Sequence, residues 1–192
     1  MRVGIFGGTF DPPHVGHLLA ASDAIEALGL DEVRFVPNAT QPLKSRDTDG
    51  AGPADRLAMV RALCGEDPRL VVDPSEVERG GLSYMVDTVR GLRERFPGAA
   101  LFLLLGEDAA ATLPEWREAA LLPDLAEIVV LTRETPAPGV ALAWRRIPTR
   151  RIDVSSTEIR ARVRAGFPIT GFVPAAVAEL IRDRGLYAKG LE

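Results

Sequence analysis

Short, mostly apolar runs alternate along the chain with longer stretches in which apolar side chains recur every three or four positions. The short runs predict strands at 3–6, 33–36, 70–72, 101–105, 128–131 and 140–147. The longer stretches predict helices at 16–28, 56–63, 83–96, 116–122 and at two places after residue 154. Strands that alternate with helices are typical of βαβ units on a parallel sheet. The pattern therefore predicts an α/β fold, a Rossmann-like, doubly wound and mainly parallel sheet with helices on both faces.

Glycine, proline and serine mark the ends of several predicted elements. Gly29 ends the first helix, and Ser83 caps the helix at 83–96. Pro174 suits the first turn of the last helix, and Gly185 suits its end. Residues 40–54 are rich in Gly, Pro, Asp and Thr, which predicts a mobile loop. No repeat divides the chain, so we expect one domain over residues 1–192, with a helical C-terminal part at about 154–188.

The bulk composition excludes several classes of function. The net charge is -4 and the pI is near 5.3, so the chain has no general attraction for nucleic acid or anionic membranes. Cys64 is the only cysteine, which excludes an internal disulfide. The sequence shows neither a secretory signal nor an apolar run of the roughly 20 residues that a spanning helix needs. We therefore expect a cytoplasmic protein that binds neither nucleic acid polymers nor membranes.

The segment at 7–17 joins the first predicted strand to the first helix and reads Gly-Gly-Thr-Phe-Asp-Pro-Pro-His-Val-Gly-His. Its glycines let a ligand approach the backbone, and a helix N-terminus offers free N–H groups that suit a phosphate. The chain's two histidines, His14 and His17, both lie here, and Gly16 leaves room between them. They could also be capping residues or metal ligands, although a zinc site would need further Cys or His side chains and the chain offers only Cys64.

A second candidate site lies at 154–160, which reads Val-Ser-Ser-Thr-Glu-Ile-Arg. Ser155 followed by Glu158 fits a capping box, so a helix starts here. On its own, the segment is explained as a well-capped helix. The same hydroxyls and free N–H groups also suit an anion, and Arg160 lies one turn away, where its planar guanidinium can reach a phosphate.

Together, the segments at 7–17 and 155–160 resemble the two signature motifs of the His-x-Gly-His nucleotidyltransferase superfamily. The resemblance covers nearly the whole chain and is most specific for the bacterial nicotinate-nucleotide adenylyltransferases. Segments similar to that family lie at 83–88, 106–108, 113–116, 166–174 and 186–187. Departures from its pattern lie at 41–44, where a histidine is missing, at Met85, where threonine is common, and at 132–135.

The resemblance implies transfer of the AMP part of ATP to the phosphate of nicotinate mononucleotide, with release of pyrophosphate, in NAD biosynthesis. The attacking phosphate is already an anion, so the enzyme aligns two polyanions and neutralises charge, with Mg²⁺ carried by the ATP phosphates and no metal site on the protein. The resemblance implies catalytic roles for His14, His17 and Arg160. The implied ATP-binding residues are Gly7, Gly8, Thr9, Phe10, His14, His17, Lys44, Gly106, Asp108, Ser155, Ser156, Thr157 and Arg160.

For the pyridine mononucleotide, the resemblance implies a site at Tyr84, Thr88 and Trp116, with the indole stacked on the ring. From the residues alone, Trp116 could be a packed core residue, and Asp108 could be a helix N-cap. Two other functions stay open: a nucleotidyltransferase acting on phosphopantetheine or a phospho-alcohol, and a catalytically silent nucleotide sensor. The Trp116 segment argues against the first, and the intact motifs argue against the second. The expected partners are ATP and nicotinate mononucleotide, and a homo-oligomer stays open.

Overall fold

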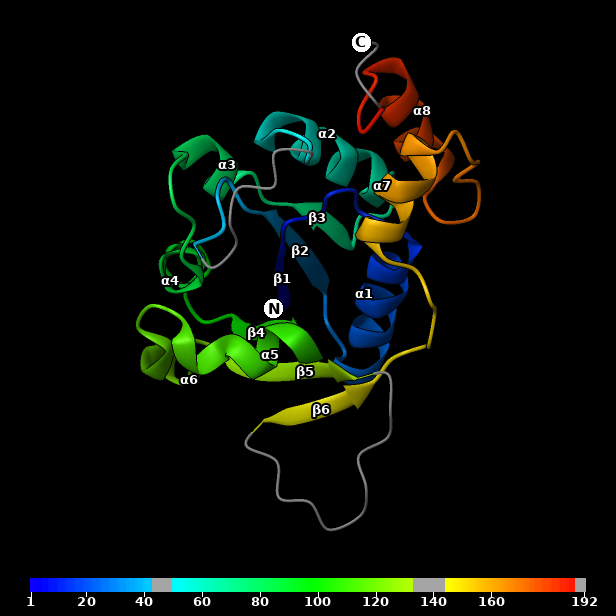
Figure 1. Ribbon diagram of the computed structural model, residues 1–192. Helices are drawn as coiled ribbons and strands as arrows, with labels where there is room; N and C mark the ends of the chain where they lie inside the picture. The colour runs from blue at the N-terminus through cyan, green and yellow to red at the C-terminus, as the bar shows by residue number, and fades with distance from the viewer. Residues whose placement is uncertain (43–49, 133–143, 189–192) are drawn as a thin grey trace.

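The computed structural model describes residues 1–42, 50–132 and 144–188. A six-stranded sheet of parallel strands lies at its centre, in the order β3-β2-β1-β4-β5-β6 (Figure 1). The chain winds outward from β1 in one direction through β2 and β3, and in the other through β4, β5 and β6. The predicted Rossmann-like α/β fold is confirmed, and the switch point of the winding lies between β1 and β4, where such sheets bind ligands. The strands are β1 (Arg2–Gly8), β2 (Glu32–Pro37), β3 (Leu70–Val72), β4 (Ala100–Gly106), β5 (Glu127–Thr132) and β6 (Arg145–Pro148).

Two layers of helices cover the sheet, because successive strand side chains point to opposite faces. On β1, Phe6 joins one hydrophobic cluster, whereas Val3 and Ile5 join the other. The first cluster packs against α1, α2, α7 and α8, and the second against α4 and α6 (Figure 1). The helices are α1 (Val15–Leu28), α2 (Pro53–Cys64), α3 (Ser75–Arg79), α4 (Met85–Arg95), α5 (Glu107–Thr112), α6 (Leu122–Leu125), α7 (Ser156–Arg164) and α8 (Ala175–Asp183), with 3-10 turns η1 (Leu113–Glu115) and η2 (Ala119–Leu121). No helix in the described ranges is long and apolar enough to cross a membrane.

Most predicted element ends are confirmed, and three predictions are corrected. The predicted loop at 40–54 ends earlier, since α2 begins at Pro53, where proline suits the first turn of a helix. Residues 43–49 of that loop, and residues 140–143 of the last predicted strand, lie outside the described residues. Ser83 does not cap α4, because the N-cap residue is Tyr84 and the Ser83 hydroxyl instead accepts a hydrogen bond from the Ala39 N–H at 3.0 Å.

The single helix predicted at 116–122 is also wrong. Trp116 has an extended backbone between the two 3-10 turns, and Glu118 has a positive φ of 52°. Pro123 lies in the first turn of α6, a position where proline is tolerated, so Leu122 begins a separate short helix instead of ending a longer one. The sequence pattern also missed α3, whose five residues are too few to show a helical repeat.

Candidate active site

The loop between β1 and α1 holds the first motif in a strained conformation. Phe10 has a positive φ of 52°, which is uncommon for a non-glycine residue and typical of functional loops. Its buried ring packs edge-on against Phe6, with centroids 5.9 Å apart, and against His17, at 5.0 Å. A Cβ on Gly8 would lie 3.0 Å from the Phe10 ring, so a larger residue where the strand meets the loop would crowd that ring.

The two histidines lie against each other at the start of α1. Their ring centroids are 3.8 Å apart, as their spacing predicted. The His14 N–H donates to His17 Nδ1 at 3.1 Å, and the His17 N–H donates to the His14 carbonyl at 2.9 Å. Because Nδ1 of His17 accepts a hydrogen bond, a neutral ring carries its proton on Nε2 and can donate it. A Cβ on Gly16 would lie 3.0 Å from the His14 ring, so glycine does leave the room that the sequence suggested.

The second motif is joined directly to the first, although the two lie at opposite ends of the chain. Ser155 caps α7 by accepting the Glu158 N–H at 3.1 Å, as predicted. The Ser156 hydroxyl donates to the Pro12 carbonyl at 2.8 Å, and Arg160 Nη1 donates to the Asp11 carbonyl at 2.8 Å. The fold therefore brings the Arg160 guanidinium and the Ser156 hydroxyl of the second motif to the loop that precedes the two histidines.

A buried tyrosine ties the same loop to the C-terminal part of the chain. The Tyr187 hydroxyl donates to Asp11 Oδ1 at 2.6 Å, and the Ala51 N–H donates to the same oxygen at 3.0 Å. Burial, together with the hydrogen bond to Asp11, raises the pKa of Tyr187 far above its usual value. The phenol is therefore a neutral donor to Asp11 near neutral pH.

A buried arginine holds the other side of the motif loop. Arg56 is 4% exposed, and its Nη1 donates to the Thr9 carbonyl at 2.7 Å and to Asn38 Oδ1 at 3.1 Å. Its other nitrogens donate to the Ala39 carbonyl at 2.9 Å and the Ala51 carbonyl at 3.2 Å. Burial lowers the pKa of the guanidinium, and nearby Asp11 opposes that shift. One cation thus fixes the backbone at the ends of β1 and β2 together.

A cavity of about 650 Å³ opens beside these motifs, at the carboxyl ends of β1 and β4. Its size suits a nucleotide-sized ligand, and its place is the switch point of the sheet. Seven of the site residues implied by the sequence are among those that line it. They are Gly7, Gly8, Thr9, Tyr84, Gly106, Asp108 and Trp116.

The remaining implied residues lie elsewhere. The two histidines, Phe10 and the second motif form the junction at the motif loop and are not among the residues that line the cavity. Thr88 is only 3% exposed, and its hydroxyl donates to Glu76 Oε1, so the side chain that faces the cavity here is Glu76. Trp116 lines the cavity with Nε1 directed to Thr112 Oγ1 at 3.2 Å, so it is not a core residue alone. Lys44 lies outside the described residues.

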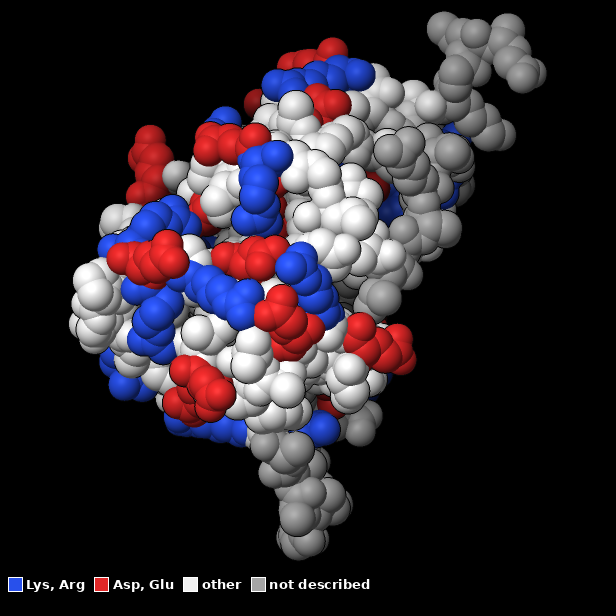
Figure 2. Space-filling model, turned by 90° about the vertical axis from the view of Figure 1, so that its left-hand side faces the viewer, with Lys and Arg blue, Asp and Glu red and all other residues white. Residues whose placement is uncertain are grey.

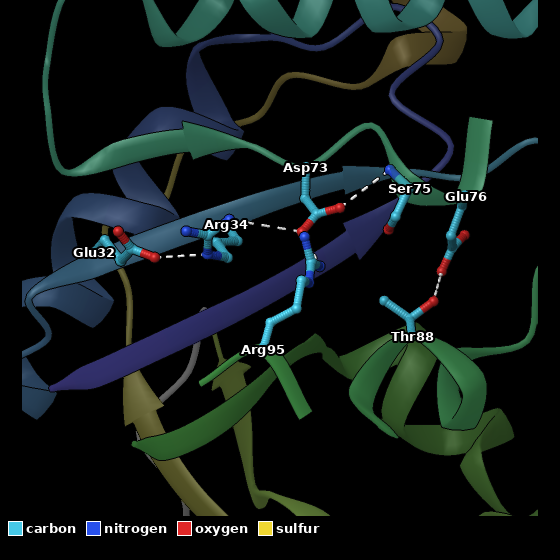
Figure 3. Close-up of polar contacts among 7 residues, drawn as sticks. All are labelled: Glu32, Arg34, Asp73, Ser75, Glu76, Thr88 and Arg95. Carbon is cyan, nitrogen blue, oxygen red and sulfur yellow. Dashed lines mark hydrogen bonds and ion pairs between the residues drawn. The ribbon is translucent and has the colours of Figure 1, made fainter. Parts of the chain in front are cut away.

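Two polar contacts fix α4, whose first turn carries one wall of the cavity (Figure 3). Near the start of the helix, Thr88 contacts Glu76, and burial raises the pKa of that carboxyl above its ordinary value. At its end, Arg95 donates to Asp73 at 2.6 Å. Burial would raise the pKa of Asp73, but hydrogen bonds from Ser75 and Arg95 outweigh it and lower the pKa. An ionised Asp73 and the Glu76 contact therefore hold α4 against the β3–α3 segment at both ends.

No group of three or more His, Cys, Asp or Glu side chains that could hold a metal ion occurs within the described ranges. Beside the acceptors Asp11 and Asn38, the motif loop is contacted by two guanidinium cations, Arg56 and Arg160, and by the Ser156 hydroxyl. Such groups suit an anionic ligand, because they stabilise the oxygens of a phosphate.

Comparison with known proteins identifies the family. Residues 5–162 match the family model described as cytidylyltransferase-like. A Gemmatimonas aurantiaca protein named "Probable nicotinate-nucleotide adenylyltransferase" is 51% identical over 97% of this chain and 92% of its own length. A Thermus thermophilus protein of the same name is 43% identical over 97% of this chain and 100% of its own. The chain belongs to the nicotinate-nucleotide adenylyltransferase family.

Solved structures share the fold of this nicotinate-nucleotide adenylyltransferase family member at much lower identity. The Plasmodium falciparum nicotinic acid mononucleotide adenylyltransferase complexed with NaAD has a TM-score of 0.77 and 18% identity, covering 100% of this chain and 99% of its own. The same enzyme complexed with APC has a TM-score of 0.75 and 16% identity. The α/β architecture is therefore retained across sequences that have diverged widely.

Sequence reasoning missed three functional candidates in this member of the nicotinate-nucleotide adenylyltransferase family. Arg56 lies on the buried side of α2 with Val60 and Leu63, and a cation at that helical spacing was the signal that could have revealed it. Glu76 gave no signal, because α3 was not predicted. Arg117 also lines the cavity; it follows Trp116 directly in sequence but was counted as part of a helix.

Proposed function

We propose that the protein transfers AMP from ATP to nicotinate mononucleotide, giving nicotinate adenine dinucleotide and pyrophosphate, as a step of NAD biosynthesis. The observation that carries the proposal is the junction of the two motifs beside an aromatic-walled cavity. Arg160 and Ser156 bind the backbone of the loop that leads to the paired histidines, while Trp116 and Tyr84 line the adjoining cavity. The proposed reaction requires groups that bind phosphate oxygens next to a site for the flat pyridine ring.

In this mechanism the protein aligns two anions and neutralises charge. The substrate phosphate attacks the α-phosphorus of ATP, the bond to the β-phosphate oxygen breaks, and pyrophosphate leaves with the electron pair. His17, whose Nε2 carries a proton when Nδ1 accepts from His14, would donate to the α-phosphate. His14 and Arg160 would act along the phosphate chain, with Ser155, Ser156 and Thr157 at the start of α7. Gly7, Gly8, Thr9, Phe10, Lys44, Gly106 and Asp108 complete the proposed ATP site.

Magnesium enters the proposal as an ion bound mainly by ATP. Mg²⁺ keeps several water ligands and binds substrate phosphates through few protein groups, and here it would neutralise charge on the leaving pyrophosphate. Residues 1–192 would act as one domain, since side chains from α7 and α8 join Phe6 and Phe35 of the sheet in a single hydrophobic cluster. We also propose, as the sequence led us to expect, that the protein acts in the cytoplasm. Its reaction involves no nucleic acid polymer.

The test is a product assay on the purified full chain. ATP, Mg²⁺ and each of four acceptors are supplied, namely nicotinate mononucleotide, nicotinamide mononucleotide, phosphopantetheine and a phospho-alcohol, and dinucleotide and pyrophosphate are measured by chromatography. We expect equimolar nicotinate adenine dinucleotide and pyrophosphate with nicotinate mononucleotide. Turnover with phosphopantetheine alone, or binding of ATP without transfer to any acceptor, would contradict the proposal.

A further inference from the structure

The exposed charges on the face that carries α4 and α6 do not form a second binding site. Acidic and basic side chains are interspersed there (Figure 2), and they include close pairs such as Arg90 and Glu118 at 2.6 Å. A surface of mixed sign has no concentrated field for a charged partner. The polar groups that the proposed mechanism leaves unused are buried around the motif loop instead. They are Asp11, Arg56 and Tyr187, each at most 8% exposed.

Tyr187 reaches the motif loop because of the way α8 docks. Just after that helix, Arg184 Nη1 contacts Asp55 Oδ1 of α2 at 2.6 Å. The backbone of Tyr187 has a positive φ of 63°, which is rare for a bulky residue and persists only where surrounding contacts hold it. The ring belongs to the hydrophobic cluster that α2 and α8 share with the sheet. This placement brings the phenol to Asp11, 176 residues away in sequence.

Asp11 is the residue through which the hydroxyl acts. Its Oδ1 accepts hydrogen bonds from the Tyr187 hydroxyl at 2.6 Å and from the Ala51 N–H at 3.0 Å. Its backbone carbonyl accepts from Arg160 Nη1 at 2.8 Å. A hydrogen bond to a carboxylate is about twice as strong as one between neutral groups. The side chain and the backbone of one motif residue are therefore fixed by three different segments of the chain.

Loss of the hydroxyl would leave a buried carboxylate oxygen with one donor fewer. Arg56 and Arg160 both act on the Tyr187 hydroxyl through their charges, so each is close enough to attract the carboxylate in its place. Because an under-satisfied buried acceptor is costly, Asp11 would shift toward one of these cations. Such a shift would disturb the loop from within, although every group that contacts a substrate in the proposed reaction would still be present.

The motif loop passes such a shift on to the histidines. Phe10, the neighbour of Asp11, has a positive φ of 52°, and its ring centroid lies 5.0 Å from that of His17. The His17 ring in turn lies 3.8 Å from that of His14. Each ring thus packs against the next, so a change in the backbone at Asp11 alters the alignment of the pair.

We propose that Tyr187 is a positioning residue: its hydroxyl, acting through Asp11, holds the motif loop in the shape that aligns His14 and His17. The inference rests on the proposed function, in which these histidines act on the ATP phosphates. Tyr187 is not among the described residues that line the cavity, so it acts without touching a substrate there.

The experiment compares the untagged full-length wild type with Tyr187→Phe, Asp11→Asn, the double variant and Ile181→Val. Pyrophosphate release gives kcat and KM, and urea unfolding gives stability. NMR spectra of protein labelled with ¹⁵N at histidine report on the motif alone, because the chain has two histidines and both lie there. Ile181→Val is the matched control, since it shortens a buried side chain of α8 that makes no hydrogen bond to Asp11.

We expect Tyr187→Phe to lower kcat by roughly 5- to 50-fold, within the roughly 10²-fold that a small misalignment can cost. The KM for the mononucleotide should change by less than about 3-fold, because the cavity that binds it is untouched. The histidine ring signals should move in Tyr187→Phe and stay in place in Ile181→Val. The losses of kcat in Tyr187→Phe and Asp11→Asn should not add in the double variant, as expected for two residues that share one hydrogen bond.

Wild-type kcat in Tyr187→Phe, or histidine signals that do not move, would overturn the inference. An equal loss of kcat in Ile181→Val would overturn it in favour of a purely structural role for this end of the chain. Additive losses in the double variant would show that Tyr187 does not act through Asp11. If the wild type forms no dinucleotide but its histidine signals move in Tyr187→Phe, the proposed function fails while the positioning of the histidines by Tyr187 stands.

Discussion

Replacing Gly16 with alanine should damage catalysis far more than stability. The added Cβ would lie 3.0 Å from Cε1 and Nδ1 of His14 and 3.3 Å from Cγ2 of Ile152. The His14 ring is 8% exposed and stacks 3.8 Å from His17, so it cannot move aside without changing the pair. Crowding of this kind costs about 1–3 kcal/mol. Alanine instead of glycine in a helix offsets at most about 1 kcal/mol of that. The net loss of unfolding free energy is therefore about 0–2 kcal/mol.

The effect on turnover is set by the histidine pair. Displacing one preorganised donor to the transition state lowers kcat by roughly 10²-fold. Gly91 provides the control, since it lies inside α4 and a Cβ there would meet nothing within 4 Å. Gly91→Ala should stabilise the protein by about 0.5–1 kcal/mol with unchanged kcat. Urea unfolding gives the two free energies, and pyrophosphate release gives kcat. A Gly16→Ala variant with wild-type kcat would refute the argument that glycine is there to seat the two rings.

The other predictions concern the site and its wall. His17→Ala should lower kcat by roughly 10²-fold with a smaller effect on substrate KM, and steady-state kinetics showing near-normal kcat would make His17 structural. Trp116→Ala should raise the mononucleotide KM by roughly 5- to 150-fold while the KM for ATP stays nearly constant. Equal increases in the two KM values would mean that the pyridine ring binds elsewhere. The pKa of Glu76 is raised above its ordinary 4.5 in the folded state, so wild-type stability is lost as pH rises through that folded pKa. In urea unfolding, the free energy of unfolding of Glu76→Gln should therefore equal that of the wild type near about pH 4 and exceed it near about pH 8. The exposed control Glu78→Gln should show no such change with pH. A difference between Glu76→Gln and the wild type that does not depend on pH would count against the raised pKa.

The periodic parts of the fold could be predicted because each strand and long helix carries its own local signal. The unbroken apolar run at 101–105 indicates a strand buried on both faces, and β4 occupies 100–106. Short elements have no such signal, so α3 was missed and the segment around Trp116 was assigned to one helix. The role of Ser83 was misjudged for a different reason: its hydroxyl is engaged by Ala39, which is 44 residues away in sequence. Contacts of that kind exist only once the chain has folded.

The site was predictable where the chemistry lies in a contiguous motif and was not where it depends on tertiary packing. His14 and His17 are three residues apart across the start of α1, and the local capping contacts between the N-cap residue His14 and His17 place them together. Thr88 was expected to face the ligand, but its partner Glu76 comes from another helix and takes that place. Arg56 acts on four carbonyl or amide oxygens from three segments of the chain, and no local pattern encodes such a set.

The motif loop depends on the far end of the chain for its shape. Asp11 accepts hydrogen bonds from Arg160 through its carbonyl and from Tyr187 through its carboxylate, over separations of 149 and 176 residues. Phe10, next to it, has a strained positive φ, which persists only where surrounding contacts over-determine it. The shape of the loop therefore depends on contacts with α7 and with the segment after α8. These contacts couple the two motifs physically: Arg160, which neutralises phosphate charge in the proposed reaction, also holds the backbone that presents the histidines to the same phosphates.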